Sequence, residues 1–115
     1  MTDREMLELA AKAGGYARHE YVENSARDGR VVTGHYDSLL EVCINPLTDD
    51  GDALRLAVQL MIRVSVNRAF PLGITDCFYF ALGEAVANGD PYAATRRAIT
   101  HAAAEIGRQM EASNG

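Results

Sequence analysis

The segment that most constrains the fold is residues 45–60, which read NPLTDDGDALRLAVQL. Pro46 has no backbone N–H to donate to a sheet, so a preceding strand should end before it. The polar side chains at 48–50 can cap a helix, and their carboxylates favour the positive end of its dipole. The segment therefore predicts a short strand over residues 39–44, followed by a helix over about residues 49–60.

The apolar side chains of this helix have the spacing of helix turns and form two stripes: Ala53, Leu56, Ala57 and Leu60 in one, and Leu54, Val58 and Met61 in the other. Only Arg55 and Gln59 are polar in the body of the helix. We therefore expect it to be the most buried of the predicted helices.

A first helix is expected over about residues 3–13. Thr2 and Glu5 form an S/T-x-x-E capping box before it. Gly14 and Gly15 end it, because glycine adopts the left-handed cap conformation at little cost. Its apolar stripe contains Met6, Leu9, Ala10 and Ala13.

A last helix is expected from Asp90 to about Met110. Asp90 is a good N-cap, and Pro91 is well tolerated at the first helical position. The predicted inward face contains Tyr92, Thr95, Ile99, Ala102, Ala103, Ile106 and Met110.

Two further strands are expected, at residues 62–67, where polar and apolar residues alternate, and at 76–82, which are rich in aromatic residues. Residues 15–38 have weak periodicity, and two alternatives remain open there. One is a hairpin about the turn at Asp28 and Gly29, projecting from the sheet, and the other is a mobile loop. In either case we expect residues 16–38 to be the least ordered internal region.

These elements predict an α+β fold in a single domain, with three helices against a mainly antiparallel sheet of three or four strands. The helix stripes need one shared surface, and the residues expected to be buried there are Leu56, Leu60, Val64, Phe80, Ile99 and Ile106.

The length, composition and charge of the chain limit the classes of protein to which it can belong. The chain has 115 residues, 48% of them hydrophobic, which suits one globular domain. Its net charge of −5 argues against a general nucleic-acid binder. It begins without a signal-like apolar core, and no apolar run approaches the ~20 residues that span a membrane. We therefore expect a soluble cytoplasmic protein in which Cys43 and Cys77 are reduced and unpaired.

The acidic group Asp49, Asp50 and Asp52 could hold Mg²⁺ or Ca²⁺, but its spacing does not match an EF-hand loop. Helix capping is the preferred interpretation. His19, His35 and His101 do not pair with one another at helical spacing. No nucleophile motif and no glycine-rich phosphate loop is present. We therefore predict no catalytic residue, no metal site and no cofactor.

Arg96, Arg97 and Arg108 are expected on the solvent side of the last helix, with Thr100 between them. Such a positive strip could contact an acidic partner or a phosphate backbone. The alternative is a solvated helix face whose arginine stems cover apolar surface, which is the commoner situation.

The segment NPLTDDGDALRLAVQL and the later DPYAATRRAITHAAAEIGRQM resemble the phage ABA sandwich domain family, which contains small phage and prophage proteins of uncharacterised function. The opening TDREMLELAAKAGG is similar to the first helix of that family. The family often has an aromatic residue, frequently Trp, where this chain has Ile44. The resemblance implies an α-β-α sandwich and no catalytic residues.

We therefore expect a non-enzymatic accessory protein of a phage or prophage that binds a protein partner and no membrane. The alternative is a nucleic-acid-associated protein that uses Arg96, Arg97 and Arg108. A small hydrolase that uses the 49–52 acidic group is the third hypothesis.

Overall fold

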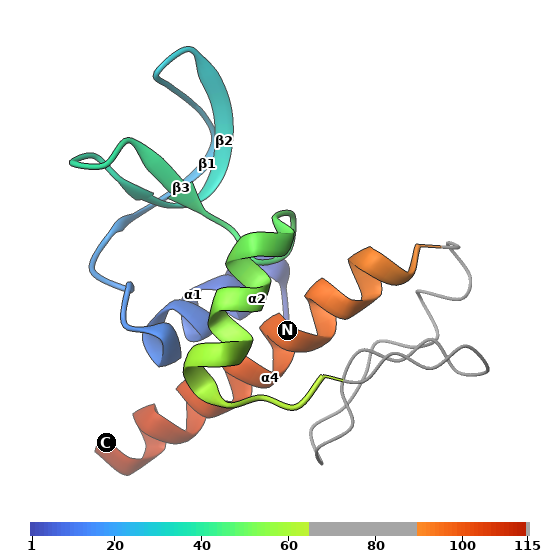
Figure 1. Ribbon diagram of the computed structural model, residues 1–115. Helices are drawn as coiled ribbons and strands as arrows, with labels where there is room; N and C mark the ends of the chain where they lie inside the picture. Colours follow the sequence, from blue (N-terminus) through green and yellow to red (C-terminus); the bar gives the residue numbers. More distant parts are fainter. Residues whose placement is uncertain (65–89, 115) are drawn as a thin grey trace.

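The computed structural model of the protein describes residues 1–64 and 90–114. In chain order they form α1 (Asp3–Gly14), β1 (Glu20–Arg27), β2 (Arg30–Asp37), β3 (Val42–Ile44), α2 (Asp50–Leu60) and α4 (Pro91–Asn114). The strands form one antiparallel sheet in the order β1-β2-β3, which lies at one end of the helices (Figure 1). The predicted α+β fold with three helices and an antiparallel sheet is confirmed. The α-β-α layering is not confirmed by this arrangement.

The capping box at the start of α1 is present as predicted. The Thr2 hydroxyl accepts a hydrogen bond from the Glu5 backbone N–H at 3.1 Å and donates one to the Glu5 carboxylate at 3.1 Å. Gly15 ends the helix in the left-handed conformation, with φ of 82°. α1 therefore begins and ends where the polar and glycine signals placed it, with one residue more at its C-terminal end.

α4 is longer than predicted, and its predicted inward face is buried in the middle, at Ile99, Ala102 and Ala103, but not at its ends. Asp90 caps it through hydrogen bonds from the Tyr92 and Ala93 backbone N–H groups, both at 3.0 Å. The helix continues past Met110 to Asn114. The predicted inward residues Tyr92 and Met110 are exposed because they lie near its ends. Its middle is buried through Ala94, Ala98, Ile99, Thr100, Ala102, Ala103 and Ala104.

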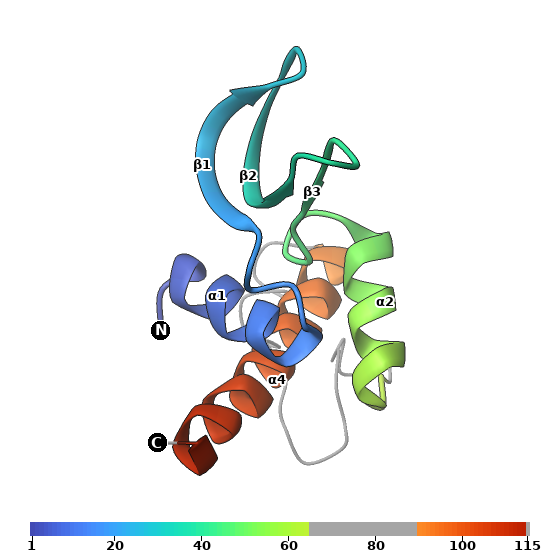
Figure 2. The same cartoon turned by 90° about the vertical axis from the view of Figure 1, so that its left-hand side faces the viewer.

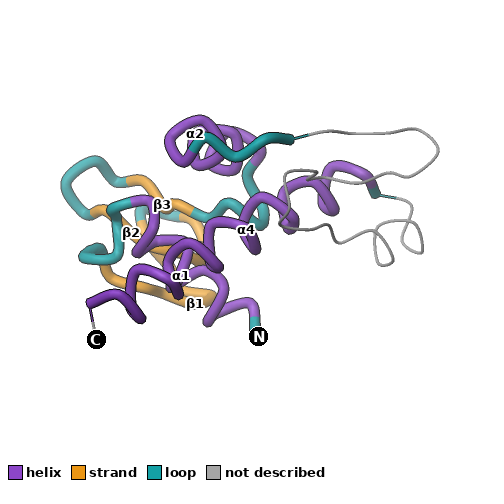
Figure 3. The backbone as a smooth tube through the Cα atoms, turned by 90° about the horizontal axis from the view of Figure 1, so that it is seen from below, coloured by secondary structure: helices purple, strands orange, loops and turns teal. Residues whose placement is uncertain are grey.

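The main core lies where α1 and α2 meet this alanine-rich middle of α4, and Figure 2 shows α4 running past both of the other helices. Small side chains let the helix axes approach closely. The closest approach is at Gly107, where an added Cβ would lie 2.1 Å from the carbonyl oxygen of Leu9 in α1. Figure 3 shows the same helices from below, beside the strands.

The N-terminus of α2 is capped by Asp49, whose carboxylate accepts a hydrogen bond from the Asp52 N–H at 2.8 Å. The helix buries only its first predicted stripe. The second stripe is exposed, with Leu54 at 62%, Val58 at 70% and Met61 at 89%. The expectation that α2 is the most buried helix is therefore wrong: among the described residues α2 contacts α4 and, less extensively, α1, whereas both of the other helices pack along the middle of α4.

The hairpin alternative for residues 15–38 is the one the structure adopts. β1 and β2 are joined by Asp28 and Gly29, both with positive φ, at 49° and 79°. Such a pair of left-handed residues matches the twist of the flanking strands. The tip projects away from the helices (Figure 1), while Val22, His35 and Tyr36 at the base are buried.

β3 begins three residues later than predicted, at Val42 rather than residue 39. The Asp37 carboxylate accepts hydrogen bonds from the N–H groups of Leu39 and Leu40, at 2.9 and 3.4 Å. Glu41 has a positive φ of 57°. These features hold residues 38–41 in a turn, so Leu39 and Leu40 are exposed and do not pair with β2.

Asn45 joins the sheet to α2. Its backbone N–H donates to the Asp52 carboxylate at 2.9 Å, and its side-chain amide donates to the Thr33 carbonyl oxygen at 2.8 Å. The side-chain oxygen accepts from the Leu47 N–H at 2.9 Å. The segment that begins at Asn45 therefore fixes how β2 and β3 meet the start of α2.

Several predictions fall partly or wholly outside the described residues. These are the strand at 76–82, the second half of the strand at 62–67, and the residues Cys77 and Phe80. Of the other five residues predicted to be buried, Leu56 and Ile99 are buried, and Leu60 and Ile106 pack against the core. Val64 is exposed, contrary to the prediction. None of the described helices is long and apolar enough to cross a membrane.

Candidate functional site

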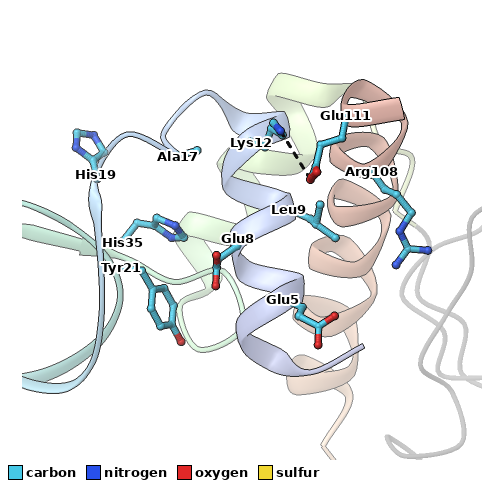
Figure 4. A pocket seen from close by; sticks show the side chains of 10 residues that line it. All are labelled: Glu5, Glu8, Leu9, Lys12, Ala17, His19, Tyr21, His35, Arg108 and Glu111. Carbon is cyan, nitrogen blue, oxygen red and sulfur yellow. Dashed lines mark ion pairs between the residues drawn. The ribbon is translucent and has the colours of Figure 1, made fainter. Parts of the chain in front are cut away.

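A groove of about 600 Å³ crosses α1 between the base of the hairpin and the C-terminal part of α4 (Figure 4). Three stretches of chain that are distant in sequence bring their side chains to it. These are Glu5, Glu8, Leu9 and Lys12 from α1, Ala17, His19, Tyr21 and His35 from the link and hairpin, and Arg108 and Glu111 from α4.

His35 is the most buried titratable side chain in the groove wall, with 3% of its surface exposed. Its ring contacts the edges of Tyr16 and Tyr21, with centroid separations of 5.5 and 5.4 Å. Its Nδ1 atom is buried and has no hydrogen-bond partner. Buried polar atoms are nearly always partnered, so the unpartnered Nδ1 beneath the groove wall is an unusual feature of this region.

The charge state of His35 follows from its surroundings. Burial lowers the pKa of the imidazole, the nearby Glu8 carboxylate opposes that effect, and His19 adds slightly to it. The neutral form, which carries one acceptor nitrogen, is therefore favoured near neutral pH. Figure 4 shows the His35 ring and the Glu8 carboxylate directed toward one another from β2 and α1.

The wall formed by α1 and β1 already holds one guanidinium group. Arg4 lies over the Tyr21 ring at 4.9 Å from its centroid, and its Nε donates to the Glu8 carboxylate at 2.9 Å. The positive group is attracted by the negative face of the ring as well as by the carboxylate. The Arg4 side chain is nevertheless 62% exposed, so both contacts are open to competition from solvent and solutes.

The two cations of the lining, Lys12 of α1 and Arg108 of α4, are paired with carboxylates. Lys12 lies 3.7 Å from the Glu111 carboxylate, and Arg108 lies 3.1 Å from that of Glu105. Glu5, by comparison, interacts with the neutral Thr2 hydroxyl. The groove therefore has net acceptor character on its α1 side, in a protein of net charge −5.

The groove contains acids, bases and aromatic rings, but its lining has no serine, cysteine or threonine to act as a nucleophile. Within the described residues, no group of three or more His, Cys, Asp or Glu side chains is placed to hold a metal ion. The groups present can form hydrogen bonds, ion pairs and ring contacts.

The three arginines predicted as a positive strip are placed at separate points. Arg96 donates to the Leu47 carbonyl oxygen at 2.9 Å and to the Asp50 carboxylate at 2.6 Å, which ties α4 to the start of α2. Arg97 binds the Asp3 carboxylate at 2.8 Å, which ties α4 to the start of α1. Only Arg108 lines the groove.

Thr100 is fully buried and donates to the Arg96 carbonyl oxygen at 2.7 Å, contrary to its expected position on the solvent side. The reason is that α4 is covered on more than one face, so a side chain beside the arginines can still be inside.

The acidic group at the start of α2 is distributed among separate partners. Asp49 caps the helix, as the preferred interpretation stated. Asp50 pairs with Arg96, and Asp52 accepts from Asn45 and Arg55. Cys43 is a free thiol in β3 whose pKa is raised by burial, so it is a weak nucleophile at neutral pH.

Apart from Arg108, none of the groove residues was predicted from the sequence to belong to a site. His19, Tyr21 and His35 were in the stretch with the weakest periodicity, and they meet Glu8 only because the hairpin folds back onto α1. The sequence signal that could have located them is the turn pair Asp28 and Gly29, which sets the register of the hairpin.

The comparisons with known proteins add nothing to the resemblance to the phage family, which rests on the sequence motifs alone. No protein-family model matches the chain, and no match was found among curated proteins or among solved structures.

Proposed function

We propose that this protein is a non-enzymatic accessory protein of phage or prophage origin that acts in the cytoplasm by binding a protein partner. The groove across α1 is the surface that contacts the partner. The origin and compartment rest on the sequence motifs and composition, and the surface rests on the geometry of the groove.

The proposal rests on one observation: the groove has a buried floor with an unsatisfied polar atom and an exposed, charged rim. His35 forms the floor. The rim consists of Glu5, Glu8, Lys12, Arg108 and Glu111. Small-molecule sites bury most of their ligand inside a largely apolar cavity, whereas protein interfaces combine a desolvated centre with a polar, hydrated rim. The groove has the second pattern.

The nucleic-acid alternative loses its main support. A phosphate-binding strip needs several cations directed at the same backbone. Arg96 and Arg97 are instead engaged by Asp50 and Asp3 and are only partly exposed. The geometry therefore favours the protein-binding proposal.

Site-specific photo-crosslinking tests the proposal. Ala17, an exposed residue of the groove lining, is replaced by a photoreactive amino acid, and the control carries the same residue at Val31, which is exposed on β2 outside the groove. Both variants are expressed in the cell that naturally contains the protein and are irradiated there. We expect the Ala17 variant to form a discrete adduct with one protein that the Val31 variant does not form. Equal adduct patterns from the two positions would contradict the groove as the contact surface.

A further inference from the structure

The Arg4 side chain contacts two residues of the groove lining, Tyr21 and Glu8, and an arginine of another protein could make the same two contacts. Its guanidinium lies over Tyr21 and pairs with Glu8, the two strongest recognition features of that wall for a cation. Both contacts are on an exposed side chain, and exposed ion pairs contribute little to stability. Exchanging Arg4 for an external guanidinium therefore costs the fold little.

We propose that the groove recognises an arginine side chain of the partner protein and that Arg4 is an internal competitor for the same place. This inference rests on the protein-binding function proposed above and specifies the partner's chemistry. The partner's guanidinium would lie over the Tyr21 ring, with its N–H groups directed at the carboxylate of Glu8, which Figure 4 shows beside that ring.

The wall of the groove supports a ligand that donates hydrogen bonds. It offers the Glu8 carboxylate beside the Tyr21 ring, and a guanidinium carries five N–H donors in a planar fork and no acceptor. The two cations of the lining, Lys12 and Arg108, are already paired with Glu111 and Glu105, so they oppose an incoming cation only weakly. The net charge of −5 adds a general attraction for a basic partner.

An NMR titration with a defined probe tests the inference. The probe is the peptide acetyl-Gly-Arg-Gly-amide, and the comparison peptide has citrulline, a neutral near-isostere, in place of arginine. We expect the arginine peptide to shift the backbone amide signals of Glu8, Tyr21 and His35 in a saturable manner, with little effect from the citrulline peptide. Equal shifts from both peptides would overturn the inference.

Two substitutions of opposite effect make the test specific. Arg4→Gln removes the internal competitor and should tighten binding of the arginine peptide about two- to fivefold, as expected for an exposed ion pair. Glu8→Gln should weaken binding by a similar factor. Arg30→Gln, at the exposed tip of the hairpin, removes the same charge as Arg4→Gln outside the groove and should leave the affinity nearly unchanged. An Arg4→Gln protein that binds no more tightly than the wild type would refute the competition.

Independent measurements distinguish a failure of the arginine inference from a folding defect and from a failure of the proposed protein-binding function. Circular dichroism should show wild-type thermal unfolding for all three variants, because the substituted side chains are exposed. A discrete adduct at Ala17 combined with no selective arginine binding would preserve the protein-binding function and reject arginine as the recognised group. Selective arginine binding without an adduct at Ala17 would support arginine as the recognised group and contradict the proposed protein-binding function.

Discussion

Gly107 of α4 lies against the backbone of Leu9 in α1, so closely that a Cβ at this position would be 2.1 Å from the Leu9 carbonyl oxygen. The contact is with backbone, which cannot rotate away as a side chain can. The α1–α4 crossing therefore depends on the missing side chain.

Gly107→Ala should destabilise the protein by about 1–3 kcal/mol, as overpacking does elsewhere, even though alanine is the better helix former. Chemical denaturation measures the change. Gly51→Ala in α2 is the matched control, because its Cβ would meet only the ends of the Asp49 and Arg55 side chains, at 3.2 Å and beyond. The control should be neutral or stabilising by up to ~1 kcal/mol. A Gly107→Ala protein as stable as the control would show that the helices can separate freely.

Arg96→Ala should cost about 1–3 kcal/mol of unfolding free energy, because it removes charge-assisted hydrogen bonds to Leu47 and Asp50 and leaves the Leu47 carbonyl without this donor. Arg108→Ala removes an exposed pair with Glu105 and should change stability by less than ~0.5 kcal/mol. Urea denaturation of the two variants measures both. If both substitutions changed stability by similarly small amounts, Arg96 would be a surface cation that contributes little to the fold.

Leu56→Ala should cost ~2–5 kcal/mol, because Leu56 lies in the main core with 3% of its surface exposed. Leu54→Ala, two residues earlier on the same helix, should cost less than ~0.5 kcal/mol, since Leu54 is 62% exposed. Thermal or urea unfolding of the pair tests which stripe of α2 faces the core. Equal costs would mean that the second stripe is also covered in solution.

Because of His35, the free energy of unfolding should decrease as the pH is lowered below the ordinary histidine range. Burial lowers the pKa of its imidazole below the unfolded value of 6.5, so the unfolded state takes up the proton first. The contribution of neutral His35 is fully present above pH 6.5 and is lost as the pH falls from there through the folded pKa. The groups that face the ring are Glu8 from α1, His19 from the link, and Tyr16 and Tyr21.

Urea midpoints measured between about pH 8 and about pH 5 test this behaviour. His35→Phe retains a ring and removes the titrating group, so its midpoint should depend less on pH than that of the wild type. His101→Gln is a necessary companion, because burial also lowers the pKa of His101. A pH dependence that survives His35→Phe and disappears in His101→Gln would assign the effect to α4.

Amide hydrogen exchange should divide the hairpin into two parts. Residues 34–36 are buried and should be nearly as protected as the middle of α2, whereas Asp28 and Gly29 at the exposed tip should exchange quickly. The expectation that residues 16–38 are the least ordered internal region thus applies to the tip. Uniform rapid exchange from 20 to 37 would contradict the docking of His35 against α1.

Local signals in the sequence determined the ends of the elements. Thr2 and Gly15 bound α1, Asp49 and Asp90 cap α2 and α4, and the pair at 28–29 permits the hairpin turn. Each of these is a contact within a few residues, so it depends on residue type and spacing alone. The three helices could therefore be predicted from the sequence, whereas the hairpin could be given only as one of two alternatives.

Tertiary structure alone decided which stripes became core and which side chains met in the groove. Periodicity showed that both stripes of α2 were apolar, but only the position of α4 left Leu54 outside and Leu56 inside. Glu8 and His35 lie close together because the hairpin folds onto α1, and the spacing of these residues in the sequence does not predict their proximity. Packing and long-range electrostatics depend on the relative placement of whole elements, which the pattern of a single sequence does not specify.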